Sequence, residues 1–499
     1  MIIKKSALFV LVLLTLIKAN PKEEIVNELI IEGQKYSYNF EIDKALKVFD
    51  TLIKKYPEDA RGYHYKSIVY LWYYLGNNEE KNFDNFIKYS EISLTKLEDY
   101  LEDNPNDQLA LLLTGSNYGY RALAFGKANK YLNMIWASQK SNSYLERVID
   151  LNPESYDAYL GLGLFKFALS QVPGSFKWAL NMIGFDADRR KGLQYLELAA
   201  EKGTYSKVEA EFYLSQIYSD FMFDYEKASR LLQGLNNRYP NNVLFQYSTA
   251  VLFIKERNLN QSENLLKKLL KNKDNSFRQI FAFSNFLLGD INFRKNNFTE
   301  AATYYDLFLT SKTSEDYKGI AAYRQGLCYF FSGEKEKSKN SFKLTGKGNV
   351  SIDDDTYAER KGEEVLKNDL SVIRTKIIQF YNYFHANELR KSEDSLSTLL
   401  KLNLSDDEKG EICTYLAEIS NAQKEFEKGF DYSMKAISLK VKDETWISPF
   451  AYYHAAFSQY SLGNMSKAKE LLGKAEDHTD FDYKSKFTSL IDQLKSKIN

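Results

Sequence analysis

The side chains best suited to metal or proton chemistry are not grouped by their spacing. The chain has four histidines, which stand far apart: His64, His385, His454 and His478. The common zinc motif needs two histidines four residues apart, because that spacing places both rings on one helix face. The sequence has no such pair. We therefore expect each histidine to pack between helices or to lie on the surface.

Three consecutive aspartates form a second candidate cation site. Asp353, Asp354 and Asp355 end a loop-like segment that begins at Gly346. A calcium loop of the EF-hand type places its ligands at alternate positions around a central glycine, and this run lacks that pattern. Acidic residues in the first turn of a helix are favoured by the helix dipole. The run therefore predicts a helix start, and we expect no metal site.

Motifs for covalent chemistry are absent from the sequence. It contains no glycine-rich phosphate loop, no serine nucleophile elbow and no Cys/His pair. A glycosidase could draw two carboxylates from distant positions, but the chain has only 4 Trp to serve as sugar platforms. The repeats in the chain also predict an open array. We expect no enzymatic activity and no cofactor.

The composition predicts a long helical chain that is neutral overall. Its 499 residues include only 7 Pro and 24 Gly, which disfavours a turn-rich β fold. Tyrosine and phenylalanine are abundant, at 37 and 33 residues. Lys plus Arg and Asp plus Glu number 67 each and alternate along the chain, so nothing directs the protein to nucleic acid or to an anionic membrane. Cys328 and Cys413 are expected to be isolated small apolar residues in helices, with a disulfide as the alternative.

The N-terminus has the pattern of a secretory signal peptide over residues 1–19. Lys4 and Lys5 precede a nearly uninterrupted apolar stretch over residues 7–17, and Ala19 offers a small residue for cleavage. The expected destination is the periplasm or the outside of a bacterial-type cell. A retained anchor is the alternative. No later apolar run is long enough for an integral membrane segment after cleavage.

From about Lys22 onward the sequence repeats itself every thirty-odd residues. The first unit has small residues at Gly33 and Ala45, followed by Phe49 and Leu52 and then by Pro57. Small residues let two helices cross closely, and proline ends the second helix. The interval of twelve between the small positions recurs in four clear copies and one weaker copy: 250/262, 289/301, 326/338, 456/468 and 417/429.

This recurring pattern of small and large residues resembles the tetratricopeptide repeat. The resemblance implies an all-α fold, an α-solenoid or superhelix of about ten to eleven antiparallel helix pairs. We expect an N-terminal array over residues 22–348, with enlarged early repeats and an insertion at 170–191, and a C-terminal array over 349–499 that ends in a capping helix. The early enlargement predicts a long second helix over residues 82–104, and one long helix through Tyr118, Phe125, Tyr131 and Trp136.

The insertion resembles a more specific family. It contains Gly184-Phe185, a polar turn with Asp188-Arg189, and a helix opened by Gly192-Leu193; Tyr357 to Lys361 matches a later motif. These residues resemble the eukaryotic tetratricopeptide proteins related to the fungal inclusion-body clearance protein. The resemblance implies a helical scaffold without catalytic residues. Read physically, residues 176–185 form an apolar helix, expected to be a buried plug or else a partner contact, and Asp186 or Asp188 caps the next helix.

The resemblance also implies which residues face the concave side of the superhelix. In this repeat family the second, fifth, ninth, twelfth and thirteenth positions of the first helix point inward, counted with the small residue at the eighth. The predicted partner-binding residues are mostly aromatic: Tyr247, Ile254, Phe283, Phe286, Phe293, Arg294, Tyr323, Phe330, Phe331, Phe450, Tyr453, Phe457 and Tyr460. Such side chains give large contact areas with polar tips. The alternative for each is packing between neighbouring repeats.

These features together predict a non-enzymatic scaffold of the cell envelope that binds a partner peptide or protein through its concave face. Two alternatives remain open. One is a secreted helical-repeat protein that binds glycans, and the other is an architectural component of an envelope assembly. The sequence indicates neither the partner nor the oligomeric state.

Overall fold

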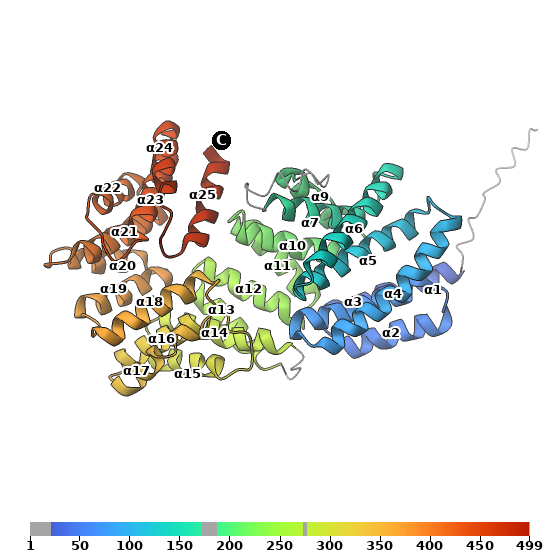
Figure 1. Cartoon of the computed structure of the whole chain (residues 1–499), viewed down its shortest axis with the longest axis horizontal. Helices are drawn as coiled ribbons and strands as arrows, with labels where there is room; N and C mark the ends of the chain where they lie inside the picture. The colour runs from blue at the N-terminus through green and yellow to red at the C-terminus, as the bar shows by residue number, and fades with distance from the viewer. Residues whose placement is uncertain (1–20, 172–186, 273–276, 499) are drawn as a thin grey trace, which may run out of the picture. The chain divides into compact units, whose positions relative to one another are not determined.

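The computed structural model describes residues 21–171, 187–272 and 277–498. Within these ranges every regular element is a helix (Figure 1), which confirms the predicted all-α class. The predicted signal peptide, and residues 172–186 of the insertion with its expected plug, lie outside the described residues. Asp188 is described, and its carboxylate accepts a hydrogen bond of 2.9 Å from the backbone N–H of Lys191, which confirms it as a cap of the next helix.

The chain divides into two compact units, Met1–Phe165 (unit 1) and Lys166–Asn499 (unit 2). Unit 1 contains α1 (Pro21–Tyr38), α2 (Ile42–Lys55), α3 (Ala60–Asn77), α4 (Glu80–Asp103), α5 (Gln108–Lys127) and α6 (Tyr131–Leu151). Helix α7 (Ala158–Ser170) spans the boundary. The predicted division at 348/349 is not the one between these units, and as a statement about separate arrays it stays a prediction.

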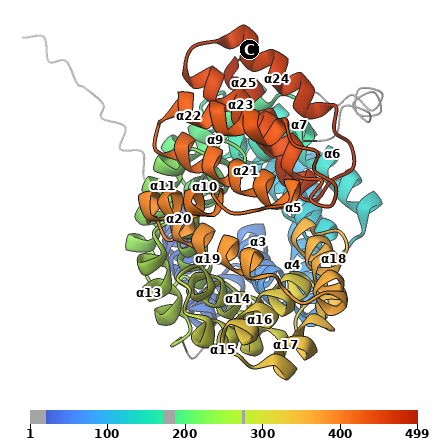
Figure 2. The same ribbon diagram turned by 90° about the vertical axis from the view of Figure 1, so that its left-hand side faces the viewer.

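Unit 2 continues the alternation of helix pairs. Its first part contains α9 (Arg189–Lys202), α10 (Lys207–Asp220), α11 (Tyr225–Arg238), α12 (Val243–Lys255), α13 (Leu259–Leu269), α14 (Arg278–Arg294), α15 (Phe298–Leu309), α16 (Lys318–Phe331) and α17 (Lys335–Phe342). Its second part contains α18 (Asp353–Lys367), α19 (Val372–His385), α20 (Leu389–Leu399), α21 (Asp406–Ala422), α22 (Phe426–Ile437), α23 (Ile447–Ser461), α24 (Met465–Glu476) and α25 (Lys484–Ile498). Figure 2 shows α19, α21 and α23 following one another as neighbours.

The long second helix predicted over residues 82–104 is confirmed by α4, but the single helix predicted through Tyr118 and Trp136 is wrong. The chain turns at Asn129, whose φ of 57° is left-handed, and α5 and α6 pack against each other as a pair. Asparagine adopts this conformation more readily than most residues because its short polar side chain can bond locally. Apolar residues recur at helical spacing on both sides of the turn, so the sequence pattern does not indicate where the helix ends.

In two of the five copies of the twelve-residue interval, and at one further pair, a hydrogen bond joins the two positions. Ser262 Oγ donates to the carbonyl oxygen of Ala250 at 2.7 Å, and Ser338 Oγ donates to that of Gly326 at 2.8 Å. Ser392 Oγ makes the same bond to Phe380 at 2.7 Å. A serine at the second small position therefore joins the two helices of a pair at their closest approach, and its bond is internal, as a buried hydroxyl requires.

Glycine at the first small position is required by the partner helix. A Cβ on Gly289 would lie 2.7 Å from the ring of Tyr305, which is fully buried and donates a hydrogen bond of 2.7 Å to Asp290. That bond and the surrounding core hold the ring in place. The close crossing inferred from the sequence is therefore present at this pair.

We expect Gly289→Ala to destabilise unit 2 by roughly 1–2 kcal/mol, because overpacking outweighs the better helix propensity of alanine. The matched control is Gly473→Ala in α24, where the space around the added Cβ is open. There the propensity gain acts alone, so stability should rise by up to about 1 kcal/mol. Urea unfolding followed by circular dichroism measures both changes. Two changes of the same sign would contradict this account of the crossing.

The three aspartates begin α18 as predicted, and two of them also hold the starts of other helices. Asp355 is buried and accepts backbone hydrogen bonds from Tyr317 (2.8 Å), Ile320 (2.9 Å) and Asn349 (2.9 Å), so it holds the start of α16. Asp353 accepts from the backbone N–H of Ser485 at 2.8 Å, at the start of α25. The run therefore links α18 to two other helices of unit 2.

Cys328 and Cys413 are both buried and unbonded to each other, as expected for isolated small apolar residues. The expected capping helix at the C-terminus is present as α25, which buries Phe487, Ile491 and Leu494 in a core shared with α23 and α24. Its additional attachment to α18, through the bond from the backbone of Ser485 to Asp353, was not expected.

Candidate functional site

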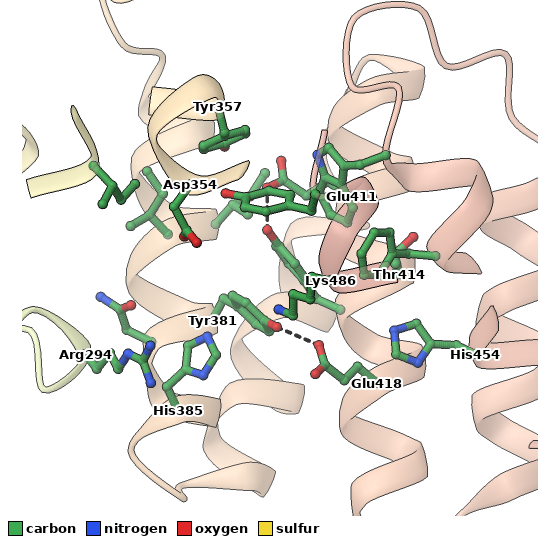
Figure 3. A pocket seen from close by; sticks show the side chains of 18 of the residues that line it. Arg294, Asp354, Tyr357, Tyr381, His385, Glu411, Thr414, Glu418, His454 and Lys486 are labelled. Atoms are coloured by element: carbon green, nitrogen blue, oxygen red, sulfur yellow. Dashed lines mark hydrogen bonds between the residues drawn. The ribbon is translucent and has the colours of Figure 1, made fainter. Parts of the chain in front are cut away.

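A cavity of about 510 Å³ lies within unit 2. Its walls come from α14, α16, α19, α21 and α23, which are the first helices of successive pairs, and from α18 and α25 (Figure 3). Because the first helices of the pairs share this lining, the cavity occupies the inner side of the array. Cavities of about 300–1,000 Å³ are the usual size for ligand pockets.

Six of the predicted binding residues line this cavity. They come from α14, α16 and α23: Phe293, Arg294, Tyr323, Phe450, Tyr453 and Phe457. The structure therefore brings together residues as distant in sequence as Phe293 and Phe457. Their role in binding a partner stays a prediction.

The other predicted residues pack elsewhere. Phe283 and Phe286 surround Phe308 in the core, with ring centroids 5.4 and 5.1 Å from it. Phe331 stacks on Phe298 at 4.2 Å. The remaining residues of the set also contact neighbouring helices or rings: Tyr247, Ile254, Phe330 and Tyr460. These positions illustrate the alternative of packing between repeats.

The binding residues predicted from the sequence include none from α19 or α21, although the repeat pattern extends to both helices and both line the cavity. The bond from Ser392 to Phe380 marks Phe380 as the eighth position of α19, although it is large. The register then predicts four residues of the cavity: Arg374, Ile377, Tyr381 and His385. The weak copy at Ala417 similarly predicts five: Glu411, Thr414, Glu418, Asn421 and Ala422.

One end of the cavity is closed by ion pairs around Arg374. Its guanidinium contacts the carboxylate of Glu411 and donates a hydrogen bond of 2.9 Å to Tyr357 Oη. Tyr415 Oη donates to the other oxygen of Glu411 at 2.9 Å. Burial raises the pKa of Glu411, although Arg374 opposes this change.

Glu444 joins this end of the cavity to α18. Its carboxylate accepts hydrogen bonds from Lys361 Nζ (2.6 Å), Arg360 Nη2 (3.2 Å) and Trp446 Nε1 (3.0 Å). Burial alone would raise the pKa of Glu444, but Arg374 and Lys361 outweigh it and lower the pKa to about 2. The carboxylate is therefore charged at neutral pH, and its bonds fix the chain segment that precedes α23.

A stack of aromatic rings forms one wall. The rings of Tyr381 and Tyr415 are 3.6 Å apart at 10°, and Trp446 follows Tyr415 at 5.6 Å and 28°. Tyr381 Oη donates a hydrogen bond to Glu418, drawn as a dashed line in Figure 3. Tyr415 therefore lies between Tyr381 and Trp446, and the three rings pack together as one aromatic wall.

Two histidines that are far apart in sequence meet at the cavity. His385 and His454 both line it, and burial lowers the pKa of each. Arg294 and Lys486 lower the pKa of His385 further, to well below its ordinary value. Both rings are therefore neutral at pH 7. Among the described residues, no group of three or more His, Cys, Asp and Glu side chains is arranged to hold a metal ion.

Comparisons with known protein families and with curated proteins also find tetratricopeptide-repeat proteins. Residues 127–367 match the family model described as Iml2/Tetratricopeptide repeat protein 39, as the insertion motif predicted. Over 362 residues the chain is 22% identical to tetratricopeptide repeat protein ttc-39B of Caenorhabditis elegans, and the alignment covers 66% of this chain and 61% of that protein. The chain thus spans less than two thirds of the length of this relative.

Solved helical-repeat structures show a looser likeness. Yeast Tom70 aligns over 95% of this chain and 96% of its own, at 14% identity and a TM-score of 0.28. The TPR domain of P58(IPK) aligns over 78% of this chain and 95% of its own, at 17% identity and a TM-score of 0.21.

Proposed function

We propose that this chain, whose residues 127–367 match the Iml2/Tetratricopeptide repeat protein 39 model, is a non-enzymatic scaffold that binds a partner protein through the inner face of unit 2. The observation that carries the proposal is the cavity lined by the first helices of successive pairs. A short segment of the partner would place one or two side chains in it.

The chemistry of the cavity supports recognition rather than catalysis. Its aromatic residues are held by their neighbours, such as Phe450 against Phe487 at 5.3 Å, so little side-chain freedom is lost on binding. Half-buried Phe457 remains available at the surface of the cavity, beside Tyr453. Aromatic anchors in preformed pockets supply most of the binding energy in typical interfaces.

The proposal predicts that Phe457→Ala weakens capture of the partner by at least about tenfold, the effect expected of an interface anchor. The matched control is Leu307→Ala, because Leu307 is 50% exposed on α15 and does not line the cavity. Both variants and the unchanged chain serve as bait in an envelope extract, and quantitative mass spectrometry compares the recovered proteins.

The outcome separates the proposal from its alternatives. Proteins lost with Phe457→Ala and kept with Leu307→Ala support a partner at the inner face. Equal recovery by all three baits contradicts it. If no protein depends on Phe457 and a glycan array gives binding that does, the glycan-binding alternative replaces it. An architectural role would instead appear as a large assembly that is unaffected by either variant.

We also propose that the protein is exported, on the basis of the charged and apolar pattern over residues 1–19. No described helix is long and apolar enough to cross a membrane. The test fuses residues 1–22 to alkaline phosphatase, which is active only outside the cytoplasm. Activity supports export, and an inactive but intact fusion contradicts it.

A further inference from the structure

The cavity contains cationic side chains that the protein only partly neutralises. Arg294, Arg324 and Lys486 reach it from α14, α16 and α25 (Figure 3 labels Arg294 and Lys486). Arg324 is paired with Asp290, whereas Arg294 is 3.7 Å from the other oxygen of that carboxylate. Among the described residues, no carboxylate lies within 4 Å of Lys486 Nζ.

The carboxylates of the cavity are engaged by the protein itself. Glu411 is held by Arg374, and Glu418 accepts from Tyr381. The third carboxylate of the lining, Asp354, lies 3.9 Å from Arg324. Among the described residues Glu418 forms no ion pair either, whereas two cations, Arg294 and Lys486, have no hydrogen-bonded carboxylate partner. This imbalance favours an anionic ligand over a cationic one, because a bound anion would satisfy donors that now lack partners.

Two buried polar atoms at the cavity also have no partner within the described chain. The hydroxyl of Tyr323 and the Nε of Arg374 make no hydrogen bond, although Tyr323 is only 4% exposed. Buried polar groups are normally satisfied, and those that are not often face a ligand or a water molecule. Both residues line the same cavity as Arg294 and Lys486.

The electrostatic potential near His385 is consistent with this arrangement. Besides burial, the charges of Arg294 and Lys486 lower the pKa of this ring and so disfavour its protonated form. The ring is therefore a neutral hydrogen-bonding group within a region of positive potential. A neutral imidazole can donate one hydrogen bond to an anion without adding a further charge.

The remaining walls suit a flat apolar body. Tyr381 and Tyr415 line it as a stacked pair, and half-buried Phe457 supplies apolar surface. We infer that this cavity binds a small aromatic molecule bearing a carboxylate or phosphate, with the anionic group held between Arg294 and Lys486. Since Lys486 belongs to α25, the ligand also links the C-terminal helix to α14. This inference concerns the same cavity as the proposed function, but it depends on the charged side chains there. Variants of Arg294 and Lys486 test the ligand, whereas the Phe457 variant tests the partner protein.

Isothermal titration calorimetry of the full chain tests the inference with three matched probes: 1-naphthyl phosphate, 1-naphthoate and the neutral 1-naphthamide. We expect one anion to bind per chain, at least about tenfold more tightly than the amide. Whichever of phosphate and carboxylate binds more tightly identifies the anionic group of the ligand. Binding of the amide as tight as that of both anions, or no binding of either anion at millimolar concentration, would overturn the inference.

Variants locate the site. Lys486→Gln and Arg294→Gln should each weaken binding of the tighter anion by about tenfold or more, while leaving amide binding unchanged. The control is Lys495→Gln, because Lys495 lies on the same helix, pairs with Glu476 and does not line the cavity. It should leave anion binding unchanged. Thermal unfolding checks that each variant is folded; if both cavity variants fold and bind the anion as the unchanged chain does, the inference is wrong.

Discussion

Glu444→Gln is expected to lower the free energy of unfolding of unit 2 by about 3–5 kcal/mol, the range observed when one partner of a buried ion pair is removed. The side chains of Glu444 and Lys361 are only 7% and 4% exposed, and their N–O distance is 2.6 Å. Without the carboxylate, Lys361 keeps only the half-exposed Glu364 as a partner among the described residues. Arg374 also loses a nearby negative charge.

The pKa of Glu444 also predicts how its contribution to stability changes with pH. The pKa of Glu444 is about 2 in the folded protein, below its ordinary value of 4.5, so its contribution to stability is fully present above pH 4.5. That contribution is lost as the pH falls through 2. The difference in stability between the unchanged chain and Glu444→Gln should therefore shrink steadily from about pH 5 to about pH 2.

Denaturant titrations at several pH values measure the effect. The control is Glu470→Gln, because Glu470 is an exposed residue of α24 that pairs with Lys467 and Lys474. Exposed pairs are screened by solvent, so this change should leave stability within experimental error. Equal effects of the two substitutions would show that the buried pairs of Glu444 are not what stabilises this part of unit 2.

The second large effect is expected at Asp355. Its carboxylate accepts three backbone hydrogen bonds, from Tyr317, Ile320 and Asn349. Asp355→Ala would leave these N–H groups without that acceptor, and each buried unsatisfied donor is destabilising by about 1–3 kcal/mol. We therefore expect a loss of at least about 3 kcal/mol.

Asp355→Asn should be less damaging, because the amide oxygen can still accept some of these bonds. Asp394→Ala, at an exposed position of α20, is the control and should change stability little. Thermal unfolding ranks the three variants. If Asp355→Ala were as stable as the control, the segment between η3 (Thr345–Lys347) and α18 would not depend on this carboxylate.

The helix pairs could be predicted from the sequence because their small residues recur at a fixed interval, at positions such as Gly289 and Ala250 where the paired helices cross closely or are hydrogen-bonded. The turn at Asn129 could not be predicted from apolar periodicity, because a single residue in the left-handed conformation does not change that periodicity. Phe380 hid the register of α19 because it is large where the other repeats are small. Extending that register would have found Arg374 and His385.

The closure of the cavity by α25 could not be predicted in the same way. Lys486 reaches the cavity because Asp353 binds the backbone at the start of α25 and Arg360 bonds to Asp482 at 2.6 Å. These contacts join positions more than 120 residues apart, and no periodic pattern specifies them. Charged side chains of this kind look like ordinary surface residues until the fold places them together.

The central claim is that a partner protein is held at the inner face of unit 2, and site-specific photo-crosslinking tests it most directly. The photoreactive amino acid p-benzoylphenylalanine replaces Phe457 in one variant and Leu307 in a second, and both are irradiated in cells. We predict a discrete crosslinked protein from position 457 and none from position 307. A crosslink from position 307 alone, or the same products from both positions, would contradict the claim.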